Sequence, residues 1–289
     1  MRFLSLASAG TGIRAVKSLA ATVLALMVLL YSADSHADLK VKARTLDEIK
    51  QKGEVVIGVF HDRKPFDYLD TDGRYKGFNI LYGDRIAKDL GVKAKYISVD
   101  TASRVEYLVT AKADIILADF SVTPERTRMV DFAMPYMKSS IGIISPDSAI
   151  IRELKDLNGR TLIVTAGSVT EKYFRKYHPQ VKLLAFDHTE ETYRALQEGK
   201  ADALAADNVE ILIWARQNKG YTAGIEGIGD EDIVAAAVQK GNKTLLNWLN
   251  NHLRTLWKEK FFHKAYDKTL KEYYGPDFDP EIILTEGSD

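Results

Sequence analysis

The sequence predicts an α/β protein of two similar lobes, each built on a mostly parallel sheet. Three observations support this: short apolar strands alternate with helical segments, one β-α-β unit occurs twice, and 289 residues are enough for about two domains. Strands separated by helices form crossover units, and such units pair their strands in parallel. The strands are apolar along their whole length, as expected for a parallel sheet covered on both faces.

The elements follow from residue patterns, taken in chain order. Residues 55–60 form a short β-branched run, which indicates a buried strand. Apolar residues then recur at helical spacing over 78–90, and Gly91 ends that helix. Further strands are expected at 95–99, 114–118, 141–145, 161–165, 182–186, 202–206 and 233–238. Further helices are expected at 103–111, 152–157, 169–177, 189–198 and 208–217. A short helix should begin at Pro124, and an amphipathic helix over 245–257 should form the C-terminal tail.

The repeated unit is a stronger signal than periodicity. Residues 112–119 read KADIILAD and residues 200–207 read KADALAAD, and each octet follows a Val-Lys pair, a strand and a helix. Extended in this way, the copies cover 92–119 and 181–207, and both end in an aspartate at the C-terminal end of a strand. The alternative is that Lys-Ala-Asp followed by apolar residues is a common junction between helix and strand. We favour two similar lobes whose facing strand ends form a ligand cleft.

Composition excludes several classes of function. The 40 basic and 40 acidic residues cancel, which argues against a nucleic-acid-binding surface. There is no cysteine, so disulfides, cysteine-ligated metals and thiol catalysis are excluded. The histidines at 61, 178, 188, 252 and 263 show no metal-ligand spacing, and no Walker loop or nucleophile elbow occurs. We therefore expect no metal and no cofactor.

Residues 1–37 have the three parts of a secretory signal peptide: basic residues, a short apolar run and a small-x-small end. The apolar run over 19–30 has 12 residues, whereas a membrane-spanning helix needs about 20. We expect cleavage after Ala37 and a slightly acidic mature protein in the periplasm. Without a cysteine near the cleavage site, nothing there can be lipidated. An uncleaved anchor helix is the alternative.

The segment after Asp119 is a candidate anion site. Thr123 is a good N-cap, and Pro124 suits the first position of a helix because it lacks an N–H. Arg126 then falls in the first turn, where a cation opposes the helix dipole. The Ser121 hydroxyl, free N–H groups and this guanidinium could hold a carboxylate. The alternative is a solvated arginine paired with a nearby acid.

Two more strand ends belong to the second lobe. Ser168 and Glu171 fit a capping box and Gly167 permits a sharp turn, which makes another anion-receptive helix start. Asp207 ends the strand at 202–206, and in the structural interpretation it is only an N-cap. In the functional interpretation its carboxylate faces the cleft and pairs with an ammonium group. An anion site on one lobe and an acid on the other would suit a free α-amino acid.

Several short motifs carry a family resemblance over roughly 45–285. They read FHDRKPF at 60–66, DG at 72–73, GF at 77–78, SVTPER at 121–126, VDF at 130–132 and PY at 135–136. With these motifs the sequence resembles the bacterial family 3 extracellular solute-binding proteins, the periplasmic receptors of polar amino-acid ABC transporters. The SVTPER stretch and the two motifs after it form the most specific part of the resemblance.

The resemblance implies roles for residues of the first lobe. Arg126 corresponds to the arginine that grips the ligand α-carboxylate, with help from Ser121 and from main-chain N–H groups near Thr123. The main chain at Ala118 and Asp119 would accept hydrogen bonds from the ligand ammonium group.

The resemblance also implies contacts from the second lobe. Residues around Ser168, Val169 and Thr170 would add contacts to the ligand carboxylate. Asp207 corresponds to the acid that binds the α-amino group. Because contacts from both lobes exist only when the lobes close, ligand would shift the population toward the closed form.

The sequence departs from the family pattern in three places. Arg63 stands where many relatives carry an aromatic platform for the ligand side chain, which leaves that face basic. Asn79 and Leu81 stand where acids are frequent, and Asp119 stands where a small or amide residue is more common. Three motifs most resemble receptors for cysteine: RKPF at 63–66, TASRVE at 101–106 and FFHKAYD at 261–267. Cysteine is therefore the first choice of ligand, and glutamine, glutamate or aspartate comes next.

The same resemblance implies a type II periplasmic binding fold, in which two segments cross between the lobes near 136–140 and 230–234. The first lobe would comprise 38–137 and 233–289, and the second lobe 138–232. The C-terminal helices would thus return to the first lobe.

The implied partners are a small-molecule amino acid and the membrane permease and ATPase subunits of an ABC transporter. We expect a monomer without enzymatic activity. One alternative is a cyclohexadienyl-dehydratase-like enzyme on the same fold, with Asp119 or Glu171 as the acid. Another is a sensory or adhesive envelope protein that uses the same cleft. The aromatic helical tail could be a membrane-surface helix, although a helix docked on the first lobe is the commoner meaning.

Overall fold

The computed structural model describes residues 41–285 of the chain. The predicted signal peptide lies outside the described residues, so its cleavage after Ala37 stays a prediction. None of the helices within 41–285 combines the length and the apolar character that crossing a membrane requires.

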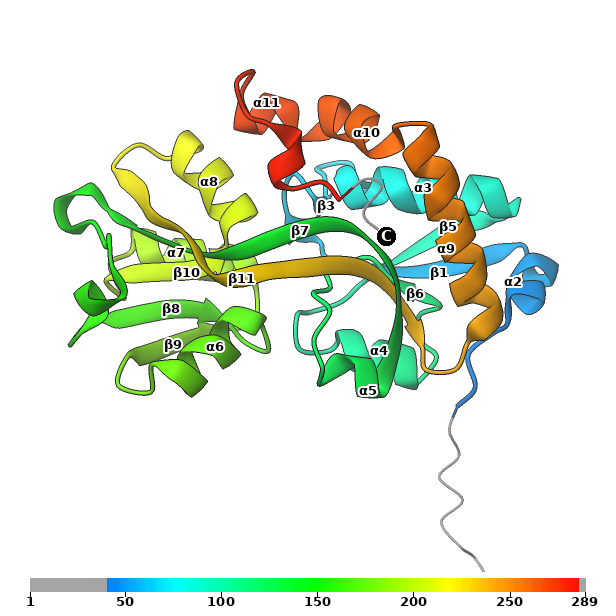
Figure 1. Cartoon of the computed structure of the whole chain (residues 1–289), viewed down its shortest axis with the longest axis horizontal. Coiled ribbons are helices and arrows are strands. Elements are labelled where there is room, and N and C mark those ends of the chain that lie inside the picture. Colours follow the sequence, from blue (N-terminus) through cyan, green and yellow to red (C-terminus); the bar gives the residue numbers. More distant parts are fainter. Residues whose placement is uncertain (1–40, 286–289) are drawn as a thin grey trace, which may run out of the picture. The chain divides into compact units, whose positions relative to one another are not determined.

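One eight-stranded sheet organises the fold (Figure 1). Its strands, in spatial order, are β5 (Lys93–Ser98), β1 (Glu54–Val59), β6 (Ile115–Ile116), β11 (Tyr221–Gln239), β7 (Val130–Pro146), β10 (Ala203–Asp207), β8 (Thr161–Thr165) and β9 (Lys182–Phe186). The first three and the last three strands form parallel triplets, with β1 and β8 in the middle. The two ends of the sheet therefore have matching topologies, which confirms the repeated β-α-β unit.

The repeated Lys-Ala-Asp motif has a structural role in both copies. Asp114 Oδ2 accepts a hydrogen bond of 2.7 Å from the N–H of Val56, near the start of β1. Asp202 Oδ2 accepts one of 2.7 Å from the N–H of Thr161, at the start of β8. The first aspartate of each octet thus ties the start of its own strand to the first residues of the parallel neighbour.

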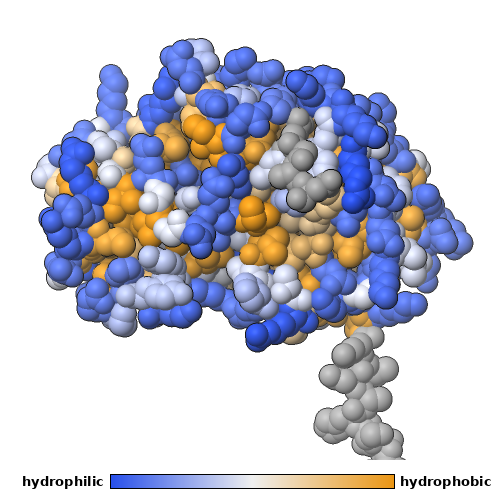
Figure 2. All heavy atoms as spheres, in the orientation of Figure 1, coloured by the Kyte–Doolittle hydropathy of each residue, from blue (hydrophilic) through white to orange (hydrophobic). Residues whose placement is uncertain are grey.

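Strands β7 and β11 are much longer than their predicted segments at 141–145 and 233–238. They cross the sheet and pair antiparallel with each other along most of their length (Figure 1). The two expected sheets are therefore joined into one, because both long strands continue from one triplet to the other. In the orientation of Figure 2, hydrophobic residues show along the middle, where these strands run, and hydrophilic residues surround them.

The pairing of β7 with β11 is irregular near its middle. Between the pairs Ile228–Ile141 and Asp232–Ser139 the register shifts, because β11 advances by more residues than β7. Bulges of this kind bend a strand and increase its twist. The irregularity borders both crossing segments that the sequence predicts.

Helices cover the sheet at both ends. The tail helix docks on the β1 end, where Leu245, Leu249 and Leu253 are fully buried in a core shared with Ile57 and Phe78. This confirms the docked interpretation of the aromatic tail. The helices at the β1 end are α2 (Leu46–Lys52), α3 (Phe78–Leu90), α4 (Arg104–Val109), α5 (Arg126–Met129), α9 (Lys243–Lys258), α10 (Phe261–Thr269) and α11 (Lys271–Tyr274). Those at the β8 end are α6 (Val169–Tyr177), α7 (Thr189–Gln197) and α8 (Asn208–Gln217).

Helix α8 belongs partly to both ends. Its Val209 and Ile213 pack into the β1-end core, and the Tyr274 hydroxyl donates to the Val209 carbonyl oxygen at 2.5 Å. The lobe boundaries expected from the sequence stay predictions for this reason. We use "first half" for the β1 end with its helices and "second half" for the β8 end with α6, α7 and α8.

Several elements differ from their predicted extents. The strand expected at 114–118 is reduced to β6, and the helix expected at 152–157 is a short 3-10 turn at Leu154–Leu157. A small antiparallel sheet, which the sequence analysis missed, holds Arg63. Its strands are β2 (Asp62–Arg63), β3 (Asp67–Leu69) and β4 (Tyr75–Lys76).

Candidate functional site

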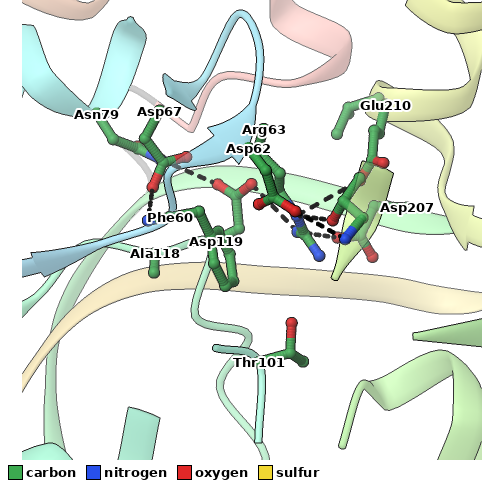
Figure 3. A network of polar contacts seen from close by, with 12 residues as sticks. Phe60, Asp62, Arg63, Asp67, Asn79, Thr101, Ala118, Asp119, Asp207 and Glu210 are labelled. Carbon is green, nitrogen blue, oxygen red and sulfur yellow. Dashed lines mark hydrogen bonds and ion pairs between the residues drawn. The ribbon is translucent and has the colours of Figure 1, made fainter. Parts of the chain in front are cut away.

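The predicted site residues gather where β6 and β10 end. Ala118 and Asp119 follow β6 in the first half, and Asp207 ends β10 at the N-cap position of α8, without a capping hydrogen bond from its side chain. Arg63 of β2 reaches between the two aspartates (Figure 3). Its Nη1 lies 3.4 Å from Asp119 Oδ2 and 3.5 Å from Asp207 Oδ2. Arg63 therefore links acids from the two halves.

Arg63 is buried and held from several sides. Its Nε donates to Thr189 Oγ1 at 3.2 Å and lies 3.6 Å from Glu210 Oε2, and its guanidinium lies 4.3 Å from the ring centre of Phe60. Burial lowers the pKa of Arg63, but Glu210 and the two aspartates outweigh this effect, so its pKa is raised overall. The basic face expected around Arg63 is thus balanced by acids.

A hydrogen-bonded amide separates two buried acids. Asn79 Nδ2 lies 3.2 Å from Asp67 Oδ1 and 3.2 Å from Asp119 Oδ1, and Asn79 Oδ1 accepts from the Tyr136 hydroxyl at 2.9 Å. Burial, followed by repulsion from Asp119, raises the pKa of Asp67 well above its usual range. An acid in place of Asn79 would have no protons to offer these carboxylates, which explains the departure from the family pattern.

Arg104 also belongs to the site, although the sequence shows it only as part of the TASRVE motif at 101–106. Its Nη1 donates to the carbonyl oxygens of Ala118 at 2.8 Å and Asp119 at 2.7 Å, and its Nε donates to that of Thr101 at 3.0 Å. Asp119 has a φ of 36°, a left-handed conformation that is uncommon outside glycine. The carbonyls expected to face a ligand ammonium group therefore accept from Arg104, and each keeps a second lone pair. Its helical spacing to Leu108 is the signal that could have placed Arg104 on the buried face of α4.

Arg126 begins the short helix α5 (Arg126–Met129) and is 5% exposed. Its Nη1 donates to the Ser121 carbonyl at 2.9 Å and its Nη2 to the Gly167 carbonyl at 3.3 Å, so Arg126 also joins the two halves. Thr123 Oγ1 accepts from the Arg126 N–H at 3.2 Å. The bond is the one expected of a capping threonine, but α5 begins later than predicted, with Glu125 rather than Thr123 as its N-cap.

The charge of Arg126 is only partly balanced. Among the described residues, no carboxylate forms an ion pair with its guanidinium, whose partners are carbonyl groups. Burial lowers the pKa of Arg126, and Asp207 and Asp232 offset this incompletely. Burial, then Arg126 and Arg63, lowers the pKa of Arg104. A carboxylate placed here would relieve the excess positive charge.

The start of α6 approaches this cation. Ser168 is its N-cap, and Ser168 Oγ accepts from the Glu171 N–H at 3.0 Å. Glu171 Oε2 accepts from the Gly167 N–H at 2.7 Å, so the predicted reciprocal bond to Ser168 is replaced by one to the residue before it. Val169 lines a cavity of about 410 Å³ that Thr123 and Arg126 also line, and Thr170 is buried.

Glu210 of α8 and Asp232 of β11 hold their protons more tightly than usual, because the pKa of each is raised. Burial raises the pKa of Glu210 to about 7, and Asp207 adds to this while Arg63 opposes it. Burial, followed by Asp207, raises the pKa of Asp232 to about 6. The site therefore changes its charge near neutral pH.

This charge change predicts a pH-dependent stability. An unfolded glutamate ionises near pH 4.3, whereas the pKa of Glu210 in the folded chain is about 7. Between about pH 4.5 and 7 the folded chain therefore binds more protons at Glu210 than the unfolded chain does. Its free energy of unfolding should then fall as the pH rises through this window. Glu210→Gln removes this pH dependence. From about pH 4.5 to pH 8, the free energy of unfolding of the variant should therefore rise by about 3 kcal/mol relative to that of wild type.

Urea unfolding at the two pH values measures this gain. Glu190→Gln, which replaces an exposed glutamate of α7, is the matched control and should follow wild type. A Glu210→Gln variant whose difference from wild type is constant over pH would contradict the assignment.

Comparisons with known proteins identify the family of this chain. The family model described as bacterial extracellular solute-binding proteins, family 3, matches residues 55–272. The chain belongs to this family. The resemblance seen in the sequence is thereby confirmed, as is the type II periplasmic binding fold with its two lobes.

Two solved structures and one sequence relative illustrate the similarity of this family 3 chain. One is the crystal structure of the solute receptors for L-cysteine of Neisseria gonorrhoeae, which is 42% identical with a TM-score of 0.82. The match covers 84% of this chain and 100% of the Neisseria chain. The other is the cysteine-binding protein from Campylobacter jejuni, which is 41% identical with a TM-score of 0.82. The match covers 84% of this chain and 99% of the Campylobacter chain. The ABC transporter glutamine-binding protein GlnH of Bacillus subtilis (strain 168) is 28% identical over 245 residues, 83% of this chain and 89% of that protein.

Proposed function

We propose that this chain is the receptor of an ABC importer and binds a small polar amino acid, cysteine first, between its two lobes. The observation that carries the proposal is Arg126, a buried cation whose partners are carbonyl groups, at a site that also holds Asp119 and Asp207. A zwitterionic amino acid would place its carboxylate against Arg126 and its ammonium group near Asp207, with charge-assisted hydrogen bonds at both ends.

Residues beside these two anchors would complete the binding site. Ser121 and Thr123 already contact Arg126. Arg126 also donates to the carbonyl of Gly167, and the next three residues, Ser168, Val169 and Thr170, form the start of α6. On the ammonium side, the main chain at Ala118 and Asp119 and the guanidinium of Arg63 would line the pocket. Arg104 would support these contacts by positioning the main chain at Ala118 and Asp119.

The choice of cysteine rests on the two cysteine receptors among the similar structures. The carboxylates around Arg63 disfavour an acidic side chain, since glutamate or aspartate would add a like charge beside Asp119, Asp207 and Glu210. Glutamine is thus the stronger of the remaining candidates.

The chain would be exported by the signal peptide at 1–37 and act in the periplasm as a monomer. The first lobe would comprise residues 38–137 and 233–289, and the second lobe residues 138–232. Closed lobes would deliver the amino acid to a permease driven by an ATPase.

A thermal-shift screen of the twenty amino acids against residues 38–289 tests the function. A ligand at a thousand times its Kd stabilises the folded state by about 4 kcal/mol, so millimolar cysteine with a micromolar Kd should raise the Tm clearly. Calorimetry should then give a single site of about −8 kcal/mol. If no amino acid raised the Tm, the receptor function would be wrong.

A dehydratase-like enzyme is the second candidate. Burial raises the pKa of Glu210 to about 7, which is the range expected of a general acid, and burial also raises that of Asp119. Incubation with prephenate or arogenate, followed by absorbance of an aromatic product, distinguishes this enzyme from a receptor. We expect no product.

Closure of the lobes predicts an effect at Gly167. A Cβ at this position would lie 2.8 Å from the Ala102 Cα of the first half, so Gly167→Ala should obstruct the approach of the halves and weaken cysteine binding at least about tenfold. Gly159→Ala is a matched control, because Gly159 has the same left-handed backbone and open space around it. Calorimetry of both variants should show the loss only at Gly167, and equal affinities would contradict the closure.

A further inference from the structure

Three metal-binding side chains meet at a second place between the halves. His61 and Asp62, at the start of β2, belong to the first half, and His188, the N-cap of α7, belongs to the second. One ligand atom from each side chain lies within 4.8 Å of the others. The two imidazole rings pack edge to face, with centroids 5.6 Å apart. The sequence shows no ligand spacing here because the chain returns to His61 only after more than a hundred residues.

The side chains of this cluster have unused ligand atoms. His61 Nδ1 is buried and has no hydrogen-bond partner among residues 41–285. Asp62 Oδ2 accepts hydrogen bonds from the N–H groups of Thr189 at 2.8 Å and Glu190 at 3.4 Å. Among residues 41–285, Asp62 Oδ1 accepts no hydrogen bond. A buried ring nitrogen without a partner is costly unless something else binds it.

His188 has the neighbour that metal-binding histidines usually have. Its Nδ1 lies 3.5 Å from Asp100 Oδ1. A carboxylate beside one ring nitrogen fixes the orientation of the ring and leaves the other nitrogen for a metal. Asp100 thus fits the role of an orienting residue outside the ligand set.

We propose that His61, Asp62 and His188 bind a divalent transition metal, for which Zn²⁺ is the best fit. Two imidazoles and one carboxylate, with water in the fourth position, are a known donor set for zinc. Ligand atoms of a tetrahedral zinc site lie about 3.3 Å apart, so the three side chains need only small rotamer changes to close around the ion.

The site ties metal binding to the arrangement of the two halves. Its ligands come from both, so the metal binds best when the halves meet and shifts the population toward that state. By linkage, the metal and the amino acid should then strengthen each other's binding. The metal site stands without the proposed function, and only this coupling rests on it.

Calorimetric titration of residues 38–289 with ZnCl₂, in a buffer that does not chelate and without amino acid, tests the site. We expect one zinc per chain, and at least about tenfold weaker binding in His61→Ala and in His188→Ala. His178→Ala is the matched control, since His178 ends α6 in the second half and is not in the cluster, and it should bind zinc as wild type does.

Each other outcome overturns the site. Wild type that takes up no zinc, or variants at 61 and 188 that bind it normally, would reject the assignment. A loss in only one of these two variants would place the metal on a single half and reject a shared site. Small-angle scattering tests the coupling separately: zinc should lower the radius of gyration of wild type but not of His188→Ala, and an unchanged wild-type value would reject the coupling.

Discussion

Arg126→Ala is expected to lower the affinity for cysteine at least about a hundredfold and to leave the fold intact. The guanidinium is buried, and its partners are the carbonyls of Ser121 and Gly167. Without it, the ligand carboxylate would be buried beside unpaired hydrogen-bond acceptors, and loss of one partner of a buried charge pair costs about 2–5 kcal/mol. Stability should fall less than affinity, because the variant loses two hydrogen bonds to carbonyl groups but no ion pair of the described residues.

Calorimetry with cysteine and a thermal melt measure the two effects of Arg126→Ala. Arg128→Ala removes an exposed arginine from the same helix and is the matched control, with affinity expected to stay at the wild-type value. Arg126→Lys should lie between, since an ammonium keeps the charge but cannot bind a carboxylate in a bidentate manner. Near-normal affinity in Arg126→Ala would reject the carboxylate site.

Asp207→Asn should be the second largest loss, also about a hundredfold in affinity. The substitution keeps the shape of the side chain and removes the charge that would pair with the ligand ammonium group. Arg63 should stay in place, because Asp119, Glu210 and Thr189 still hold it. The effect should therefore fall on ligand binding more than on stability.

A second readout separates a charge effect from a structural one. Asp207 raises the pKa values of Glu210 and Asp232, so Asp207→Asn should move both toward their ordinary values. NMR titration of the carboxyl groups measures this shift. Asp187→Asn, an exposed aspartate that follows β9, is the matched control for affinity. Wild-type affinity in Asp207→Asn would mean that another group binds the ammonium.

The local pattern of the sequence predicted much of this structure. Helix α3 begins at Phe78 and ends before Gly91 as expected, and α6 covers the predicted 169–177 with Ser168 as its N-cap. These features depend on residues within a few positions of one another, so periodicity and capping residues are enough to place them. The repeated unit went further and put Asp119 and Asp207 at the ends of corresponding strands.

The partners of the site residues were beyond the reach of sequence patterns. Arg63 bonds to Thr189 across 126 positions, Arg104 anchors the turn at Asp119, and His61 meets His188 only because the halves face each other. The raised pKa values of Glu210 and Asp232 come first from burial, which depends on how distant segments pack.

The sequence by itself determined the α/β class, the repeated unit and the residue types that stand at the strand ends, because hydrogen bonding and periodicity along one segment decide these. Only the tertiary structure decided that β7 and β11 join both halves in one sheet, and which charges share the buried site. The energy of a charge depends on its desolvation and on neighbours a few ångströms away, and folding brings those neighbours from remote parts of the chain.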